Sequence, residues 1–363
     1  MAVFEDNKWA PCQLAYALRT RRQKIDSANA KTFAISRSIH YGVFLVFDGI
    51  RFYVKKQAKN KVTLVFLNAD KNITRFIEGM RFTLSPEQQS LVPSEEEILQ
   101  LFIKYLGHPR MRPFLRKMAK DSSQGYIRPF TLDDEQSIGV TFPNNPTVRV
   151  VASRYKSYLG EPFDGVVIPY LVRAVGVNGT GRLKLGNNYL LSIRAVGEAR
   201  NILPSAKAAL FLDDKPNDRL EDRVITEWDS SSCLIALTNG KVIRIPDNDL
   251  ALPSVTLKGI VRILEEFKVP LDERNMTYGE LIDLVKRKEI VTICSVGTAG
   301  ILSRCSNLLL IDSQKNKLAL MKSDTSNPLY EKLVEVKKYY WEIYKGTVKT
   351  PAGLNRTEYE IRV

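Results

Sequence analysis

Residues 179–189 read GTGRLKLGNNY and place one lysine, Lys184, among glycines at positions 179, 181 and 186. A lysine on a solvated surface needs no such setting. Lysine acts as a nucleophile only when its amine is neutral, and burial lowers its pKa because burial disfavours the charged form. Glycines permit sharp turns and a close approach of the backbone to a ring-shaped ligand. Taken alone, the stretch is explained more simply by a plain turn, and it indicates a buried, reactive amine only together with its neighbours.

The composition is that of a globular protein long enough for two domains. The chain has 363 residues, of which 44% are hydrophobic, and it contains no apolar run near the ~20 residues of a membrane span. The N-terminal sequence MAVFEDNKWAPC lacks the basic start and apolar core of a signal peptide, so we expect a cytoplasmic protein. Four scattered cysteines and two histidines argue against a disulfide framework and against a metal site.

The net charge of +14 raises the question of nucleic-acid binding. The densest basic stretches, at residues 17–24 and 108–120, lack the interleaved aromatic residues of a base-stacking surface. We therefore favour an enzyme with a basic surface, whose charge would attract anionic substrates, over a nucleic-acid-binding protein.

The first part of the chain mixes strands and helices. A helix is expected over residues 94–106, opened by a capping box of Ser94 and Glu97. Residues 153–165 are rich in polar, glycine and proline positions, as in a linker. We expect a small N-terminal domain (1–155), a linker (156–165) and a large C-terminal domain (166–363). The strands expected in this part are 42–54, 62–69, 137–142 and 147–153.

The second part alternates helices and strands more regularly. Helices are expected at 189–201, 254–267, 276–288 and 329–346. Strands are expected at 208–214, 223–228 and 289–302, the last running into a Gly-Thr-Ala turn, and a hairpin with an Asn239-Gly240 turn is expected at 232–246. The chain thus belongs to the α/β or α+β class, with two lobes.

With its neighbours, the lysine stretch resembles the branched-chain amino-acid aminotransferases, the fold-type IV enzymes that use pyridoxal 5′-phosphate. The resemblance extends from about residue 35 to the closing helix, with the motifs in the family's order. It implies a small α/β domain followed by a larger domain with a barrel-like sheet. It also implies that Lys184 forms the Schiff base with the cofactor and that Tyr189 hydrogen-bonds the cofactor's phenolic oxygen.

Three stretches extend the resemblance on the cofactor side: ITEW (225–228), LPSVT (252–256) and SVGTA (295–299). The carboxylate of the first would keep the pyridine nitrogen protonated and so improve the ring as an electron sink. Backbone N–H groups at the helix start in the second would hold the phosphate. The cofactor-binding residues implied by the resemblance are Lys184, Tyr189, Glu227, Leu252, Val255, Thr256 and Thr298, with Asn68 at the position of a phosphate-binding arginine. Without the resemblance, Glu227 is an ordinary strand-end acid.

Two stretches resemble the family's substrate pocket: HYGVFLVFDG (40–49) and GYIRPF (125–130). An arginine in the second would bind a substrate carboxylate by charge-assisted hydrogen bonds. The implied substrate-binding residues are Tyr41, Phe47, Tyr126, Arg128, Thr298 and Ala299, and we expect an apolar lining from Phe44, Phe47 and Trp228. Without the resemblance, Arg128 is a surface cation and Tyr126 a core aromatic.

The chain also departs from the family pattern. Asn68 stands where the family has the arginine that clamps the cofactor phosphate, and this loss would weaken binding by roughly 1.5–3 kcal/mol. Lys71 or Arg75 would be candidates to compensate. Trp228 and Asp229 stand where small residues usually flank the pocket, which leaves the substrate open.

The sequence thus predicts a homodimeric, pyridoxal-phosphate-dependent aminotransferase. It would move the amino group of a branched-chain-like L-amino acid to 2-oxoglutarate by a ping-pong mechanism, in branched-chain amino acid biosynthesis. Two alternatives stay open. One is a transaminase or lyase with a different substrate, similar to the aminodeoxychorismate lyases. The other is a non-catalytic protein that binds RNA or another acidic partner through its basic surface.

Overall fold

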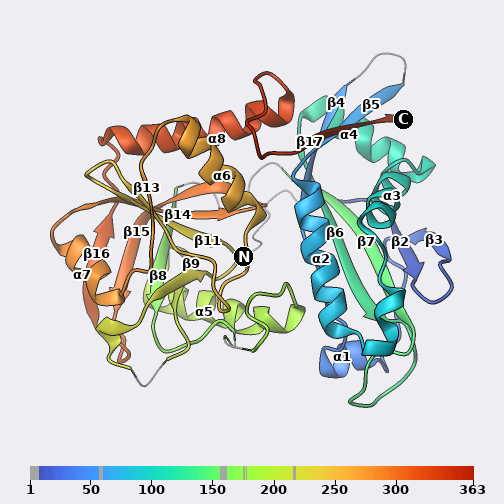
Figure 1. The fold of residues 1–363 in the computed structure, drawn as a ribbon, viewed down its shortest axis with the longest axis horizontal. Helices are drawn as coiled ribbons and strands as arrows, with labels where there is room; N and C mark the ends of the chain where they lie inside the picture. Colours follow the sequence, from blue (N-terminus) through green and yellow to red (C-terminus); the bar gives the residue numbers. More distant parts are fainter. Residues whose placement is uncertain (1–7, 57–59, 156–161, 175, 177, 216–217) are drawn as a thin grey trace.

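The structure, a computed structural model, describes residues 8–56, 60–155, 162–174, 176, 178–215 and 218–363. Two lobes lie side by side, each built on its own β-sheet (Figure 1). Among the described helices, none is long and apolar enough to cross a bilayer. The mixed α/β class predicted from the sequence is confirmed.

The first lobe contains an eight-stranded sheet formed by the described residues, in the order β17-β5-β4-β6-β7-β2-β3, with β1 paired to β7. Its strands are β1 (Lys8–Trp9), β2 (Cys12–Ala17), β3 (Gln23–Ser27), β4 (Ile50–Lys56), β5 (Lys61–Leu67), β6 (Gln124–Asp133), β7 (Pro146–Tyr155) and β17 (Arg356–Arg362). Its helices are α1 (Arg37–Tyr41), α2 (Ala69–Thr83), α3 (Glu95–Leu106) and α4 (Arg112–Asp121), with 3₁₀ turns η1 (Pro86–Leu91) and η2 (Pro109–Met111).

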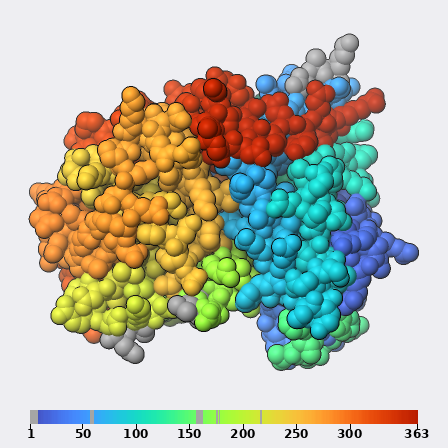
Figure 2. All heavy atoms as spheres, viewed as in Figure 1, coloured from blue at the N-terminus to red at the C-terminus, as the bar shows by residue number. Residues whose placement is uncertain are grey.

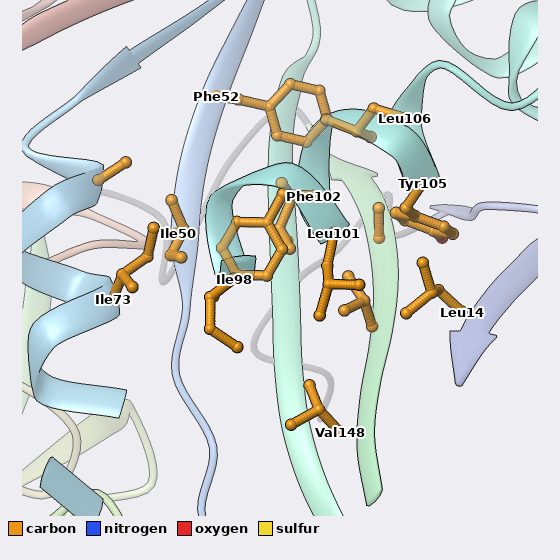
Figure 3. Packing of buried hydrophobic residues seen from close by; sticks show 14 of the residues in the cluster. Leu14, Ile50, Phe52, Ile73, Ile98, Leu101, Phe102, Tyr105, Leu106 and Val148 are labelled. Atoms are coloured by element: carbon orange, nitrogen blue, oxygen red, sulfur yellow. The ribbon is translucent and has the colours of Figure 1, made fainter. Parts of the chain in front are cut away.

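Helix α3 shows how the sequence builds this core. The predicted capping box is present: the Ser94 hydroxyl accepts a hydrogen bond from the Glu97 backbone at 3.2 Å, and the Glu97 carboxylate accepts one from the Ser94 backbone. The apolar positions recur every three or four residues and are buried. Their side chains point onto the sheet (Figure 3), namely Ile98, Leu101, Phe102 and Tyr105.

The second lobe is a barrel. Its strands are β8 (Phe163–Ile168), β9 (Ala206–Leu212), β10 (Ile225–Trp228), β11 (Ser232–Leu237), β12 (Val242–Arg244), β13 (Leu271–Glu273), β14 (Ile290–Gly297), β15 (Ile301–Ile311) and β16 (Lys317–Lys322). Of these described strands, β10, β9, β8, β15, β14 and β11 form a closed ring, because β10 also pairs with β11. Closure removes the unpaired strand edges that an open sheet would expose.

Helices surround this barrel: α5 (Tyr189–Ile202), α6 (Val255–Glu266), α7 (Tyr278–Lys286) and α8 (Pro328–Lys345), with 3₁₀ turns η3 (Gly186–Asn188) and η4 (Leu220–Asp222). Helix α5 lies near the boundary between the lobes, and α6 and α8 lie together on one side of the barrel (Figure 1). The amino-terminal ends of α5 and α6 line the cavities described below.

The last strand returns to the first lobe. After α8 ends at Gly346, strand β17 pairs antiparallel with β5 along its whole length. Figure 2 shows this last part of the chain, in red, lying across the boundary between the lobes. The expected large domain (166–363) therefore contributes a strand to the first sheet, which local sequence patterns do not reveal. The domain boundaries themselves stay a prediction.

One predicted strand is wrong. Residues 137–142 form a loop, with a single bridge between Ser36 and Ser137. The apolar residues that suggested a strand, Ile138, Val140 and Phe142, are exposed rather than packed. Alternation of apolar residues therefore did not mark a half-buried strand at this place. Most of the expected linker (156–165) lies outside the described residues.

Candidate active site

Lys184 lies in the connection that precedes α5, facing the first lobe. Its Nζ is 2.8 Å from the hydroxyl oxygen of Tyr189, and its backbone carbonyl accepts a hydrogen bond from the Phe47 N–H at 3.0 Å. Burial lowers the pKa of Lys184 to about 8, and the nearby Arg75 guanidinium contributes in the same direction. With this pKa, a minor but substantial fraction of the amine is neutral near physiological pH.

At least one glycine near this lysine is needed for packing of the backbone rather than for room beside a ligand. A Cβ atom on Gly181 would lie 2.3 Å from the carbonyl oxygen of Asp249, so only glycine fits there. A Cβ atom on Gly186 would meet nothing closer than 3.6 Å. Gly181 therefore allows the lysine loop to pack closely on residues 249–250.

Glu227 lies on β10 and forms a buried ion pair with Arg173, with Oε1 and Nε 2.5 Å apart. The same carboxylate oxygen accepts a hydrogen bond from the Leu252 N–H at 3.2 Å. Arg173 also donates to the carbonyls of Gly181 and Leu250, at 2.7 and 3.0 Å. Burial raises the pKa of Glu227, and the positive charge of Arg173 opposes this rise.

Sequence reasoning missed Arg173, because a single arginine in YLVRAVG matches no motif by itself. The available signal was indirect: a buried glutamate needs a positive partner. The pair and Lys184 line one small cavity together with Tyr189, Leu252 and Thr298. The structure thus brings most of the expected cofactor residues to one place.

A second small cavity adjoins the start of α6. The Ser254 hydroxyl caps this helix by accepting a hydrogen bond from the Leu257 N–H at 3.1 Å. The N–H groups of Val255 and Thr256, in the first turn, have no acceptor within the helix. The hydroxyls of Thr256 and Thr298 are 3.5 Å apart across this cavity. Hydrogen-bond donors and the positive end of a helix dipole therefore converge there.

Asn68 does not line either small cavity. It is the N-cap residue of α2, and its Oδ1 accepts a hydrogen bond from the Asn355 N–H at 2.8 Å. Asn68 thus holds the segment that leads into β17. Of the two candidates to compensate, Lys71 is 66% exposed and paired with Asp70. The other, Arg75, binds the Asp48 carboxylate and the Pro253 carbonyl.

A second arginine that sequence reasoning missed, Arg51, holds the Gly-Thr-Ala turn. Its guanidinium donates to the carbonyl of Thr298, at 2.9 Å from Nε, and to that of Ala299. It also lies over the rings of Tyr155 and Trp341. A residue of the first lobe thereby fixes a turn of the second lobe.

Tyr126 and Arg128 lie in the largest of these three cavities, which has a volume of about 390 Å³. The Arg128 guanidinium donates to the Tyr126 hydroxyl at 2.9 Å and stacks over the ring of Phe47, 4.5 Å from its centroid. Gly49 makes room for this pair, since a Cβ atom there would lie 1.7 Å from the Tyr126 hydroxyl oxygen. Lys184, Thr298 and Ala299 line the same cavity.

Three expected lining residues lie elsewhere. Trp228 is buried inside the barrel, stacked edge-on against Phe163, and its indole N–H donates to the Cys294 carbonyl. Phe44 belongs to the core of the first lobe, and Tyr41 is 46% exposed on α1. The alternation of side chains along a strand explains why Trp228 does not line the cavity. Its neighbours Glu227 and Asp229 both face the small cavity, so Trp228 between them faces the interior of the barrel.

No family model matches the chain. It is 25% identical to branched-chain-amino-acid transaminase 1 of Bacillus subtilis (strain 168) over 323 residues, which cover 87% of this chain and 82% of the relative. It is 27% identical to the branched-chain-amino-acid aminotransferase of Dictyostelium discoideum over 294 residues, 77% of this chain and 70% of the relative.

Solved structures share the fold. The branched-chain aminotransferase of Thermoproteus uzoniensis with norvaline superposes with a TM-score of 0.68 at 19% identity, covering 93% of this chain and 96% of the other. The T.th. branched-chain amino acid aminotransferase complexed with N-(5′-phosphopyridoxyl)-L-glutamate gives 0.67 at 20% identity, covering 94% and 97%. The chain is thus similar in sequence to branched-chain-amino-acid aminotransferases over most of its length, and it shares the two-lobed fold, with its barrel, of their solved structures.

Proposed function

We propose that this chain is a pyridoxal-phosphate-dependent aminotransferase, and that Lys184 is its catalytic residue. One observation carries the proposal: the Lys184 amine has a pKa of about 8 and donates a hydrogen bond to the Tyr189 hydroxyl. Glu227 and its partner Arg173 line the same cavity. A partly neutral amine and a buried carboxylate within one cavity are what an aldehyde cofactor with a basic ring nitrogen requires.

The residues fit such a group on its phosphate side as well. The free N–H groups at the start of α6 and the hydroxyls of Thr256 and Thr298 would hold the phosphate. Leu252 would lie against the ring, and Tyr189 would hydrogen-bond the ring oxygen. With the Asn68 side chain bound to Asn355, phosphate binding would depend on neutral donors and on Arg75, which lines the small cavity beside Lys184 while it is paired with Asp48.

The cofactor, when bound, supplies a carbonyl that takes up amines and a ring that accepts the electron pair from the substrate α-carbon. Lys184 would remove the proton from that carbon and return it during transfer, acting as base and then as acid. Glu227, held by Arg173, would keep the ring nitrogen protonated. Tyr126, Arg128 and the Thr298–Ala299 turn would orient the substrate carboxylate, and Phe47 would cover one side of the cavity.

We further propose a branched-chain-type L-amino acid as donor and 2-oxoglutarate as acceptor, in a ping-pong sequence, as the names of the relatives and the residue resemblance suggest. A homodimer is proposed too. Exposed apolar side chains on α1, the 137–142 loop and the start of α5 support it, among them Ile39, Val140, Phe142, Leu190 and Ile193. Sedimentation at several concentrations tests the dimer. The cytoplasmic location stays a prediction.

The deciding experiment is a spectrum of the purified protein with pyridoxal phosphate, before and after borohydride, followed by peptide mapping. The expected result is a visible absorbance band, lost on reduction, and a pyridoxyl group on Lys184. A protein that shows no band, or carries the label on another lysine, contradicts the proposal. Lys184→Ala should abolish both the band and the glutamate formed from L-leucine and 2-oxoglutarate.

A further inference from the structure

A buried ion pair connects the walls of two cavities. Asp48 lies between Phe47 and Gly49, which both line the main cavity, and its side chain is fully buried. Arg75, on α2, binds this carboxylate through two nitrogens, at 2.9 Å from Nε and 2.8 Å from Nη2. Asn72, one turn earlier on the same helix, donates to the same carboxylate at 3.2 Å. These contacts fix the position of the Arg75 guanidinium.

Arg75 also holds a loop of the second lobe. Its remaining terminal nitrogen, Nη1, donates to the Pro253 carbonyl at 2.8 Å. On one side of Pro253, the Leu252 N–H donates to the Glu227 carboxylate. On the other side, Ser254 caps α6, whose first turn has free N–H groups. Arg75 is therefore bonded to the residue between the partner of Glu227 and the proposed phosphate site.

The charges of this pair act on Lys184. Arg75 and Lys184 line the same small cavity, which has a volume of about 40 Å³. Beyond burial, the Arg75 guanidinium lowers the pKa of Lys184, and the Asp48 carboxylate opposes this shift. A nearby cation disfavours a protonated amine, whereas a nearby anion favours it. Because arginine does not lose its proton in proteins, Arg75 is a permanent charge beside the lysine.

Other charged or titratable groups face Lys184 from β6, from α5, from the end of β10 and from the segment before the lysine loop. They are Tyr126, Arg128, Tyr189, Glu227, Asp229 and Arg173. Glu227 and Arg173 are bonded to each other, so their charges offset. Among the charged side chains, Arg75 has the largest effect on the pKa of Lys184, and Asp48 has the next largest.

We propose that Arg75 is a positioning residue of the first lobe that keeps Lys184 in its uncharged, nucleophilic form and holds the loop at Pro253. The proposal rests on the proposed aminotransferase function, in which the Lys184 amine must be neutral to react with an aldehyde. Asp48 limits the first effect, because it compensates part of the Arg75 charge. It supports the second effect, because it fixes the guanidinium against the Pro253 carbonyl.

The test measures the rate at which Lys184 reacts with pyridoxal in the apo-protein, between about pH 6 and pH 10. Borohydride fixes the adduct, and peptide mapping reports the pyridoxyl group on Lys184 at each pH. Pyridoxal has no phosphate group, so a contact between Arg75 and a phosphate does not enter the result. Its own titration is the same for every variant, and differences in the midpoint of the pH profile therefore report the protein.

Two variants should move this midpoint in opposite directions. Arg75→Met removes the cation and should raise the midpoint by about half a pH unit or more, whereas Asp48→Asn leaves the cation uncompensated and should lower it by a similar amount. Arg75→Lys keeps a positive charge and should restore a midpoint close to that of wild type. If Arg75→Met does not fold, the double variant Arg75→Met/Asp48→Asn buries neither charge. It should still raise the midpoint, because Arg75 has the larger effect.

Hydrogen exchange measures the hold on the loop. A peptide that spans residues 249–257 should exchange roughly tenfold faster in Arg75→Met than in wild type. Arg81→Met, at an exposed position of the same helix, and Asp283→Asn, at an exposed position of α7, are the matched controls and should change neither measurement.

The outcomes separate this proposal from the proposed function. Opposite shifts for Arg75→Met and Asp48→Asn support the proposal, because a role in folding alone gives no difference in sign. If Lys184 is labelled but both variants keep the wild-type midpoint or move it in the same direction, the proposal is wrong and the proposed function stands. Unchanged exchange of the loop contradicts the positioning of Pro253. If Lys184 takes no label in the wild-type protein, both fail.

Discussion

Glu227 and Asp229 are two residues apart and line the same small cavity, yet their surroundings differ. Glu227 has a buried arginine 2.5 Å away. Asp229 has no ion pair among the described residues, and burial raises its pKa to about 6. Burial raises the pKa of both acids; Arg173 opposes this rise at Glu227 through a direct ion pair, whereas Arg200 opposes it at Asp229 only through its charge. Adjacent positions of one strand end can therefore take unlike roles.

The largest expected effect comes from breaking the Glu227 pair. Arg173→Met would leave Glu227 buried without its partner and should cost about 3–5 kcal/mol of unfolding free energy. Denaturant unfolding of the apo-protein measures this loss, with the exposed Arg219→Met as control. The double variant Arg173→Met/Glu227→Gln should recover part of the stability. If Arg173→Met lowers the free energy of unfolding no more than Arg219→Met does, the ion pair with Arg173 does not stabilise the buried Glu227.

The second effect concerns activity. Glu227→Gln removes the charge opposite the ring nitrogen and should lower kcat by about 100-fold or more with cofactor bound. Single-turnover absorbance changes with L-leucine measure it. Glu335→Gln, on the exposed surface of α8, is the matched control. If Asp229→Asn lowers the rate as far as Glu227→Gln does, the contrast between the two acids is lost.

A third effect involves Lys184, whose lowered pKa of about 8 places its titration between pH 7 and 9. The neutral fraction rises about tenfold over this interval, so the rate at which apo-protein captures pyridoxal phosphate should rise about tenfold and then level off. Stopped-flow absorbance measures the rate. Lys184 loses its proton near pH 8 in the folded protein but near pH 10.5 in the unfolded chain. The free energy of unfolding should therefore also rise with pH between these two values. A capture rate independent of pH would contradict the assignment.

The smallest effect is the pH dependence of Asp229. The pKa of Asp229 in the folded protein, about 6, lies above its usual value of 3.8, so the folded state binds the proton more tightly than the unfolded state. This contribution to the free energy of unfolding is complete below about pH 4 and is lost as the pH rises through 6. Asp229→Asn should therefore gain on the order of 1 kcal/mol relative to wild type between pH 5 and 7. Urea unfolding at the two pH values measures the difference, and Asp283→Asn should show none.

Local patterns in the sequence predicted the elements well. The Ser94 capping box, the start of α6 at Ser254 and the end of α8 at Gly346 depend on neighbours within a few residues, and all three are present. The motif around Lys184 carried the resemblance to the aminotransferase family together with the Gly-Thr-Ala turn and the other ordered stretches. Local chemistry sufficed for these features because caps, turns and periodic faces are satisfied within one or two turns of chain.

Features that depend on distant partners were missed or misjudged. Arg173 is recognisable only beside Glu227, 54 positions later in the numbering, and the place of Asn68 is set by Asn355. The sequence predicted that Trp228 lines the pocket, but in the barrel its side chain lies on the other face of β10. In a strand, neighbouring side chains point to opposite faces, and the sequence alone does not say which face borders the cavity.

The sequence by itself determined the resemblance to the aminotransferase family, the choice of Lys184 as candidate nucleophile and the order of most elements, since these follow from short-range patterns. Only the tertiary structure decided which charges are paired, that β17 returns to the first sheet, and that Arg75 joins the two lobes beside Lys184. The physical reason is that pairing and burial depend on residues brought together from distant parts of the chain, and no local pattern encodes their distance.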